Sequence, residues 1–126
     1  MFTDPGLAVI GERAKPGDPA QVLGSASYDD QGRAKVMARN AGLAHLYAEP
    51  EHGRLTGAAM VGPGVEHSAH LIAWAIQQGR TATEVLELPF YHPTYEEGLK
   101  PALREICKTV HAPTSRDRDE GMLPGS

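Results

Sequence analysis

The chain has 126 residues, about the length of a single domain, with room for one hydrophobic core. Its net charge of −4 comes from intermixed acidic and basic residues, without a basic patch for nucleic acid or a lysine- and arginine-rich helix for a membrane surface. The apolar runs fall short of the roughly 20 residues that span a bilayer, no signal-peptide pattern is present, and a single cysteine excludes an intrachain disulfide, so we expect a cytoplasmic protein.

Four β-strands are expected in the first half of the chain. Residues 7–10 form a short apolar run bounded by Gly and Pro, and residues 20–28 alternate in polarity. Residues 43–48 and 55–61 are β-type runs, and the five polar or turn-forming residues 49–53 lie between them, which indicates a β-hairpin. Between the second and third strands, residues 33–38 are expected to form a short turn or helix.

The last of these strands should present two distinct faces, because side chains alternate along a strand. Several of its residues are small, which allows a helix to pack closely on the sheet. One face is expected to carry Leu55, Gly57, Ala59 and Val61, and the other Thr56, Ala58 and Met60.

A helix is expected over residues 65–78, with Gly79 placed to end it. One apolar stripe runs along this helix, and a second apolar surface that includes Leu71 and Trp74 lies beside the stripe. A surface helix of a small monomer has one apolar stripe and a polar back. We therefore expect this helix to be covered on two sides, by its own sheet and by another surface.

Two further helices are expected. Residues 81–86 form a brief helix with Thr81 as N-cap and Glu84 three residues later. The last helix is expected to begin near residue 94 and to end near residue 110. Pro101 should either kink this helix or mark a fresh start.

Strands followed by helices predict an α+β fold, in which an antiparallel β-sheet carries helices packed on one face. We expect one domain over residues 2–110. Residues 111–126 are polar and lack a core-forming pattern, so a disordered C-terminal tail is expected there.

The stretch HPTYEE at residues 92–97 is the most informative one for function. It sets His92 on a short loop at a helix entrance, and Pro93 restricts His92 to extended backbone. An imidazole transfers protons near neutral pH, and a carboxylate within reach of its far nitrogen would fix the tautomer and stabilise the charged ring. His92 and Glu97 are therefore the candidate acid–base pair.

Some of these residues also have structural interpretations. Thr94 and Glu97 have the spacing of a capping box, which does not exclude a role of Glu97 beside His92. His67 and His70 are three residues apart on a helix, but the sequence offers no two further ligands for a structural zinc ion. Polar-face histidines are therefore expected, and no metal site is predicted.

The sequence lacks the other parts of a redox active site. It contains no G-x-G-x-x-G or G-x-x-x-x-G-K-[ST] motif and no C-x-x-C pair. Cys107 falls at helical core spacing and is expected to be a buried hydrophobe. The chain thus supplies an acid–base pair without a nucleophile, and we expect it to be one part of a larger enzyme.

Three segments together resemble the C-terminal dimerisation domain of the FAD-dependent pyridine nucleotide–disulfide oxidoreductases, which include dihydrolipoamide dehydrogenase, glutathione reductase and mercuric reductase. The segments are FTDPGLAVIG at residues 2–11, LTGAAMVGP at 55–63 and HPTYEE at 92–97. The resemblance covers about residues 2–108. The WAIQQG and PFYHP stretches are most similar to dihydrolipoamide-dehydrogenase-like members.

The resemblance implies a two-fold homodimer, in which this domain of one subunit presents His92 to the redox disulfide and flavin of the other. His92 would take a proton from the dithiol substrate, Glu97 would orient the ring, and His92 and Pro93 would face the cofactor. The flavin and nucleotide domains of the full-length enzyme would hold FAD and NAD(P). The chain alone is expected to bind neither cofactor and to be inactive.

The sequence also departs from the family. The flavin domain, the nucleotide domain and the redox cysteines are missing, as expected for an excised piece or a separately encoded remnant. Residues 12–19 are short and proline-rich where the family often has a helix. The alternative is a freestanding, non-catalytic protein-interaction or dimerisation module with the same fold. A small His/Glu hydrolase is disfavoured because no nucleophile accompanies His92.

Overall fold

The computed structural model describes residues 6–27, 42–62, 64–88 and 96–112. Within these residues, four strands form one antiparallel sheet in the order β1-β4-β3-β2. The elements are β1 (Gly6–Gly11), β2 (Val22–Ser27), β3 (Leu43–Ala48), β4 (Leu55–Gly62), α2 (Val65–Gln77), α3 (Ala82–Leu86), the 3₁₀ helix η2 (Glu96–Leu99) and α4 (Lys100–Thr109).

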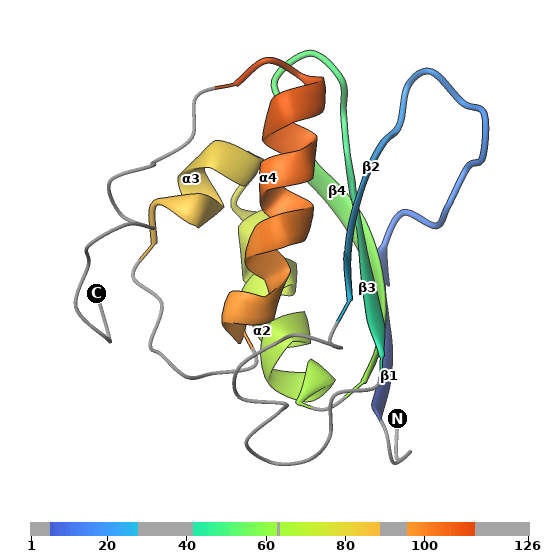
Figure 1. Cartoon of the computed structure of the whole chain (residues 1–126), viewed down its shortest axis with the longest axis vertical. Coiled ribbons are helices and arrows are strands. Elements are labelled where there is room, and N and C mark those ends of the chain that lie inside the picture. Colours follow the sequence, from blue (N-terminus) through green and yellow to red (C-terminus); the bar gives the residue numbers. More distant parts are fainter. Residues whose placement is uncertain (1–5, 28–41, 63, 89–95, 113–126) are drawn as a thin grey trace.

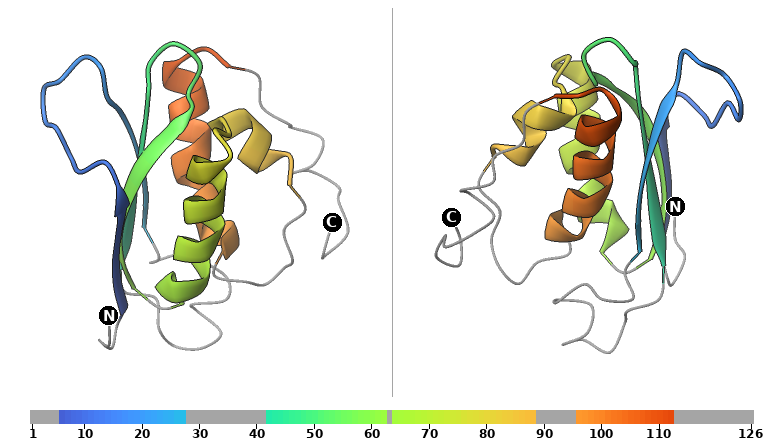
Figure 2. Two further views of the ribbon diagram at one scale, coloured as in Figure 1. Left: turned by 180° about the vertical axis from the view of Figure 1, so that it is seen from behind. Right: turned by 45° about the horizontal axis from the view of Figure 1, so that its top comes forward.

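The helices lie on one face of the sheet, and no described element covers the other face (Figure 1). α2 packs on β1 and β4, α4 packs on β2 and β3, and α3 packs against α4 (Figure 2). The predicted α+β fold, an antiparallel sheet with helices on one face, is thus confirmed. None of the helices in the described part of the chain has the length and apolar character needed to cross a membrane.

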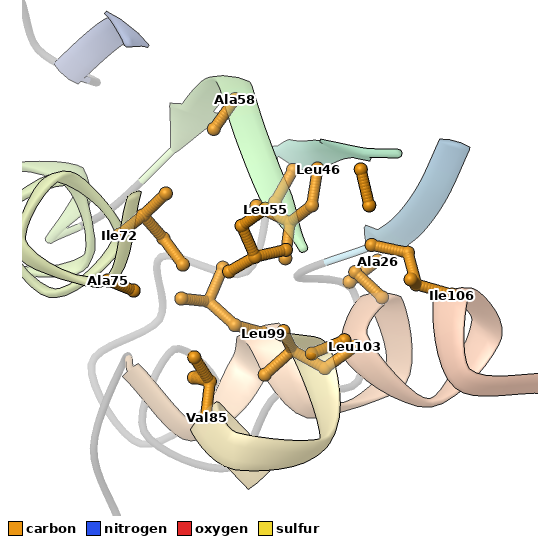
Figure 3. Packing of buried hydrophobic residues seen from close by; sticks show 14 of the residues in the cluster. Ala26, Leu46, Leu55, Ala58, Ile72, Ala75, Val85, Leu99, Leu103 and Ile106 are labelled. Atoms are coloured by element: carbon orange, nitrogen blue, oxygen red, sulfur yellow. The ribbon is translucent and has the colours of Figure 1, made fainter. Parts of the chain in front are cut away.

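The hydrophobic core lies between the sheet and the helices. Leu99, just before α4, lies among Leu55, Ile72 and Val85, which come from three other elements (Figure 3). The exposed fraction of each of these four side chains is 2% or less. One core therefore joins β4, α2, α3 and the beginning of α4.

Gly24 sets the distance between α4 and β2. A Cβ atom at this position would overlap the carbonyl oxygen of Ala102 and would lie 2.8 Å from Cγ1 of Ile106. Both contacts come from α4, so a larger residue would push this helix away from the sheet. The close approach of the helix explains a glycine inside this strand.

A β-bulge in β4 shows that one sequence prediction was wrong. The register between β3 and β4 shifts near the end of β3, which leaves Thr56 as an additional residue in β4. Because the alternation reverses there, Leu55 lies in the core with Ala58 and Met60. Strict alternation had placed Leu55 on the opposite face, together with the exposed Val61.

The ends of α2 and α3 agree with the sequence. α2 is followed by Gln78 as C-cap and by Gly79, whose φ of 67° is in the left-handed region that favours glycine. α3 begins with the predicted capping box. The Glu84 N–H donates to Oγ1 of Thr81 at 3.2 Å, and the Thr81 N–H donates to the Glu84 carboxylate at 2.9 Å.

The last helix is divided, with a 3₁₀ turn over Glu96–Leu99 before α4. Pro101 lies in the first turn of α4. The N–H groups of a first turn have no acceptor within the helix, so the missing N–H of Pro101 costs nothing there. Of the two predicted outcomes for Pro101, the structure has the fresh start.

Some sequence predictions lie outside the described residues, among them the turn or helix at 33–38, the capping residue Thr94 and the tail after Ala112. Ala112 follows the end of α4 and is held against it, because its N–H donates to the carbonyl of Cys107 at 2.8 Å. The proline-rich loop at residues 12–19 contains turns and no helix, as the sequence indicated.

Candidate functional site

The predicted acid–base pair belongs to a segment of which only one end is described. His92 and Pro93 lie outside the described residues, whereas Glu97 lies half-buried in η2. The geometry of the site therefore rests on the two elements that border residues 89–95, which are α3 before the segment and η2 after it.

α3 fixes the chain that leads into this segment. Val85 and Leu86 are buried against the core. Just before α3, Nη1 of Arg80 lies 3.2 Å from a carboxylate oxygen of Glu84, which is in the first turn of this helix. The N–H of Leu88 donates to the Val85 carbonyl at 3.1 Å. The chain is therefore held by the fold as far as Leu88, which precedes position 92 by four residues.

η2 and α4 fix the chain that leaves the segment. Glu97 stands two residues before Leu99, whose side chain is fully buried in the core. Glu97 lies in the first turn of η2, and negative charge is favourable near the N-terminus of a helix.

The other histidines of α2 lie on its exposed side. Nε2 of His67 is 3.7 Å from a carboxylate oxygen of Glu66. The ring of His70 meets the ring of Trp74 edge-on, with centroids 5.6 Å apart. These are surface histidines, as predicted. In the described ranges, no three His, Cys, Asp or Glu side chains come together in a group that could hold a metal ion.

Cys107 is buried in the core, as its helical spacing predicted. Burial raises the pKa of its thiol, and the Thr83 hydroxyl oxygen, 3.5 Å from the sulfur, opposes this effect in part. The neutral thiol is thus favoured, and a neutral thiol is a poor nucleophile. Cys107 is a core residue and no part of a reaction centre.

A groove of about 270 Å³ lies between α2 and the chain of α3. Trp74 is on its rim with 60% of its surface exposed, the highest fraction among the exposed large apolar side chains. The lining residues are Leu71, Trp74, Ala75, Gln78, Arg80, Glu84, Val85 and Leu88. The side of the groove formed by α2 is the second apolar surface that the sequence predicted. The side formed by the chain of α3 could not be predicted, because it depends on how α3 packs beside α2.

The open face of the sheet is a second apolar surface, on the side opposite the helices. Strand register places His45 and Tyr47 on this face. Large apolar side chains from all four strands are between 40% and 55% exposed there, namely Leu7, Val9, Leu23, Leu43 and Val61.

A small α+β domain with exposed apolar side chains on two sides is of the kind that works in contact with more protein. The family model described as "Pyridine nucleotide-disulphide oxidoreductase, dimerisation domain" matches residues 1–103. The chain belongs to this family, whose members are FAD- and NAD-dependent oxidoreductases.

Curated relatives agree with this assignment. The chain is 32% identical over 117 residues to the dihydrolipoyl dehydrogenase of Halobacterium salinarum, which covers 88% of this chain and 24% of the relative. It is 33% identical over 119 residues to the dihydrolipoyl dehydrogenase of Bacillus subtilis, which covers 89% of this chain and 25% of the relative. The chain thus spans about a quarter of the length of these relatives.

Solved structures show the same fold. LpdA from Mycobacterium tuberculosis matches with a TM-score of 0.75 and 23% identity, over 82% of this chain and 23% of that chain. The Cu(II) complex of the HOCl-induced flavoprotein disulfide reductase RclA from Escherichia coli matches with a TM-score of 0.75 and 18% identity, over 82% and 24%. At these identities the likeness concerns the fold alone.

Proposed function

We propose that the chain is the dimerisation domain of a flavin-dependent NAD(P)–disulfide oxidoreductase of the dihydrolipoyl dehydrogenase type. In this proposal it supplies His92 and Glu97 to the redox disulfide of the partner subunit, and it is inactive by itself. The family match over residues 1–103 carries the proposal. It is supported by the two anchored elements, α3 and η2, that border the histidine segment.

The proposed chemistry is a proton transfer that prepares thiol–disulfide exchange. His92 accepts the proton of a substrate S–H group, and the resulting thiolate attacks one sulfur of the disulfide. A new S–S bond forms as the old one breaks, and the second sulfur leaves as a thiolate. Glu97 orients the imidazole and stabilises its charged form. His92 is the catalytic residue, and Glu97 is a positioning residue.

In this proposal, FAD and NAD(P) are bound by other domains of a longer enzyme. The sequence has no G-x-G-x-x-G loop for a dinucleotide phosphate. The chain also spans only about a quarter of the length of the dihydrolipoyl dehydrogenases to which it is similar.

A domain exchange tests the catalytic proposal. Residues 2–112 would replace the matching region of the Bacillus subtilis dihydrolipoyl dehydrogenase, and turnover would be measured as a function of pH. We expect the chimaera to turn over, and His92→Gln to lower kcat by about 10²–10⁴-fold, because the general base is lost.

Two comparisons make this experiment specific. Glu97→Gln should move the acidic limb of the pH profile to lower pH, because the charged imidazole loses the carboxylate that stabilises it. Glu96→Gln, which alters the adjacent carboxylate, should leave the profile unchanged. The isolated chain with FAD, NADH and a disulfide should show no turnover. A chimaera whose turnover is insensitive to His92→Gln contradicts the proposed role of this histidine.

The alternative is a freestanding dimerisation module without chemistry. The coding region that precedes the chain discriminates between the two. An in-frame G-x-G-x-x-G motif and a redox cysteine pair would support the enzyme, and their absence would favour the module.

A further inference from the structure

We propose that Pro101 is a positioning residue for the acid–base pair. Pro101 prevents α4 from extending backwards through Glu97, keeps this glutamate in the 3₁₀ turn η2, and so sets the direction of its carboxylate. The inference rests on the proposed function for the role of Glu97. It adds a residue that lies outside the HPTYEE stretch and that the proposed chemistry does not use.

The first argument concerns a hydrogen bond that Pro101 cannot make. In an α-helix each N–H donates to the carbonyl four residues earlier, so an α-helix through Glu97 would need an N–H at position 101. Proline has no N–H, and its ring would also clash with the Glu97 carbonyl. A 3₁₀ helix uses the carbonyl three residues earlier, which would require the N–H of Lys100 instead. The sequence thus allows a 3₁₀ turn at Glu97 and opposes an α-helix there.

The second argument is that the helix type changes at this place without a capping side chain. η2 ends at Leu99 and α4 begins at Lys100, with Pro101 in its first turn. The N-cap residue is Leu99, whose side chain accepts no hydrogen bond and whose φ and ψ of −79° and −16° are themselves helical. The backbone therefore turns continuously from η2 into α4, and Pro101 remains as the feature that separates the two helix types.

The third argument comes from the direction of the Glu97 side chain. Leu99 is fully buried in the core and gives the turn a fixed reference, and η2 packs against α2, α4 and β2. Glu97 lies about 240° around the axis from Leu99 in a 3₁₀ helix and about 200° in an α-helix. In the α-helix it would point almost directly away from the core. Its observed half-burial agrees with the 3₁₀ direction.

The difference between the two geometries is large enough to matter for proton transfer. Between Leu99 and Glu97 they differ by about 40° in direction and about 1 Å in rise. A misplacement of about 1 Å in a catalytic arrangement can lower the rate about 100-fold. Pro101 therefore influences the reaction through the backbone of Glu97, without touching the substrate.

Pro101→Ala tests the structural step in the 126-residue chain. The variant regains an N–H at position 101, and alanine is the best helix former. We expect the Glu97 carbonyl to protect this N–H from hydrogen exchange, and the backbone chemical shifts of residues 96–99 to become α-helical. Unchanged shifts in the folded variant overturn the proposal. Thermal melting checks the fold, and Pro101→Gln replaces the variant if it melts early.

The same substitution in the Bacillus subtilis chimaera tests the consequence for catalysis. We expect kcat to fall by about 10–100-fold, and the acidic limb of the pH profile to move to lower pH, as for Glu97→Gln. A merely structural loss would lower the amount of active enzyme and leave the limb in place, which overturns the proposal. Pro19→Ala, in the loop between β1 and β2, is the matched control and should change neither quantity.

A double variant shows whether Pro101 acts through Glu97. The losses from two residues that act through the same group do not add. Pro101→Ala should therefore lower kcat no further when Glu97→Gln is already present. Additive losses overturn the proposal, because Pro101 would then influence catalysis by another route.

Failure of this proposal and failure of the catalytic one give different results. If the catalytic proposal fails, His92→Gln and Glu97→Gln leave turnover unchanged, while the hydrogen-exchange result at position 101 still reports on the backbone of Glu97. If the positioning proposal alone fails, His92→Gln and Glu97→Gln still change turnover and its pH profile, and Pro101→Ala leaves the acidic limb in place.

Discussion

At the scale of single residues, Glu49 shows how one carboxylate organises a turn. Its two oxygens accept N–H groups of the β3–β4 connection: Glu51 at 2.8 Å, His52 at 2.7 Å and Arg54 at 3.0 Å. Burial is the largest single influence and raises the pKa of Glu49, but the three backbone donors and the nearby His52 together outweigh it, so that the pKa lies below its ordinary value. The turn is therefore held by a charged acceptor.

We expect Glu49→Gln to destabilise the fold by on the order of 1 kcal/mol at neutral pH, after allowance for solvent screening. The carboxylate has a lower pKa in the folded chain than in the unfolded chain. Its contribution is therefore complete above the ordinary value of about 4.5 and is lost as the pH falls through the folded-state pKa. The free energy of unfolding, measured with urea, should therefore be higher for the wild type than for the variant at neutral pH, and this difference should disappear in acid. Glu51→Gln, which alters a carboxylate exposed beside His52, is the control and should not produce this difference.

At the scale of elements, the contact between β2 and α4 leaves no room for a side chain at position 24. Gly24→Ala would bring a methyl group into the backbone of Ala102, so we expect a loss of about 1–3 kcal/mol, the usual cost of overpacking. Ser25→Ala, one residue along the same strand but on the open face, should change stability by less than about 0.5 kcal/mol. Urea midpoints of the two variants measure the difference, and equal midpoints would show that α4 can move without cost.

The strands and helix ends could be predicted because their signals are local. Gly79 ends α2 through its left-handed backbone, and Thr81 with Glu84 begins α3 through their own hydrogen bonds. The bulge at Thr56 could not be predicted, because it depends on how β4 pairs with a different strand. Of the candidate site, the family motif predicted His92 and Glu97, and only Glu97 lies in the described part of the chain, where the 3₁₀ turn before α4 holds it.

At the scale of the whole molecule, the open sheet face leaves large apolar side chains of all four strands exposed. Such surfaces limit the solubility of an isolated domain. We expect the chain to bind a hydrophobic dye, and Val9→Lys together with Leu23→Lys to lower the dye signal and raise the solubility limit. Both residues lie on the edge strands, where lysine is well tolerated. An unchanged dye signal in the double variant would mean that the exposed apolar surface lies elsewhere.

The strand order has a consequence for how the chain is made. β1 is synthesised first, yet its sheet partner is β4, and Gly6 pairs with Gly62, fifty-six positions later. Until β4 has emerged from the ribosome, the nascent β1 segment has no strand to pair with. The β3–β4 hairpin forms from neighbouring residues and can serve as the template. The β1 segment is therefore among the last parts of the chain to join its sheet, and its apolar side chains stay exposed in the interval.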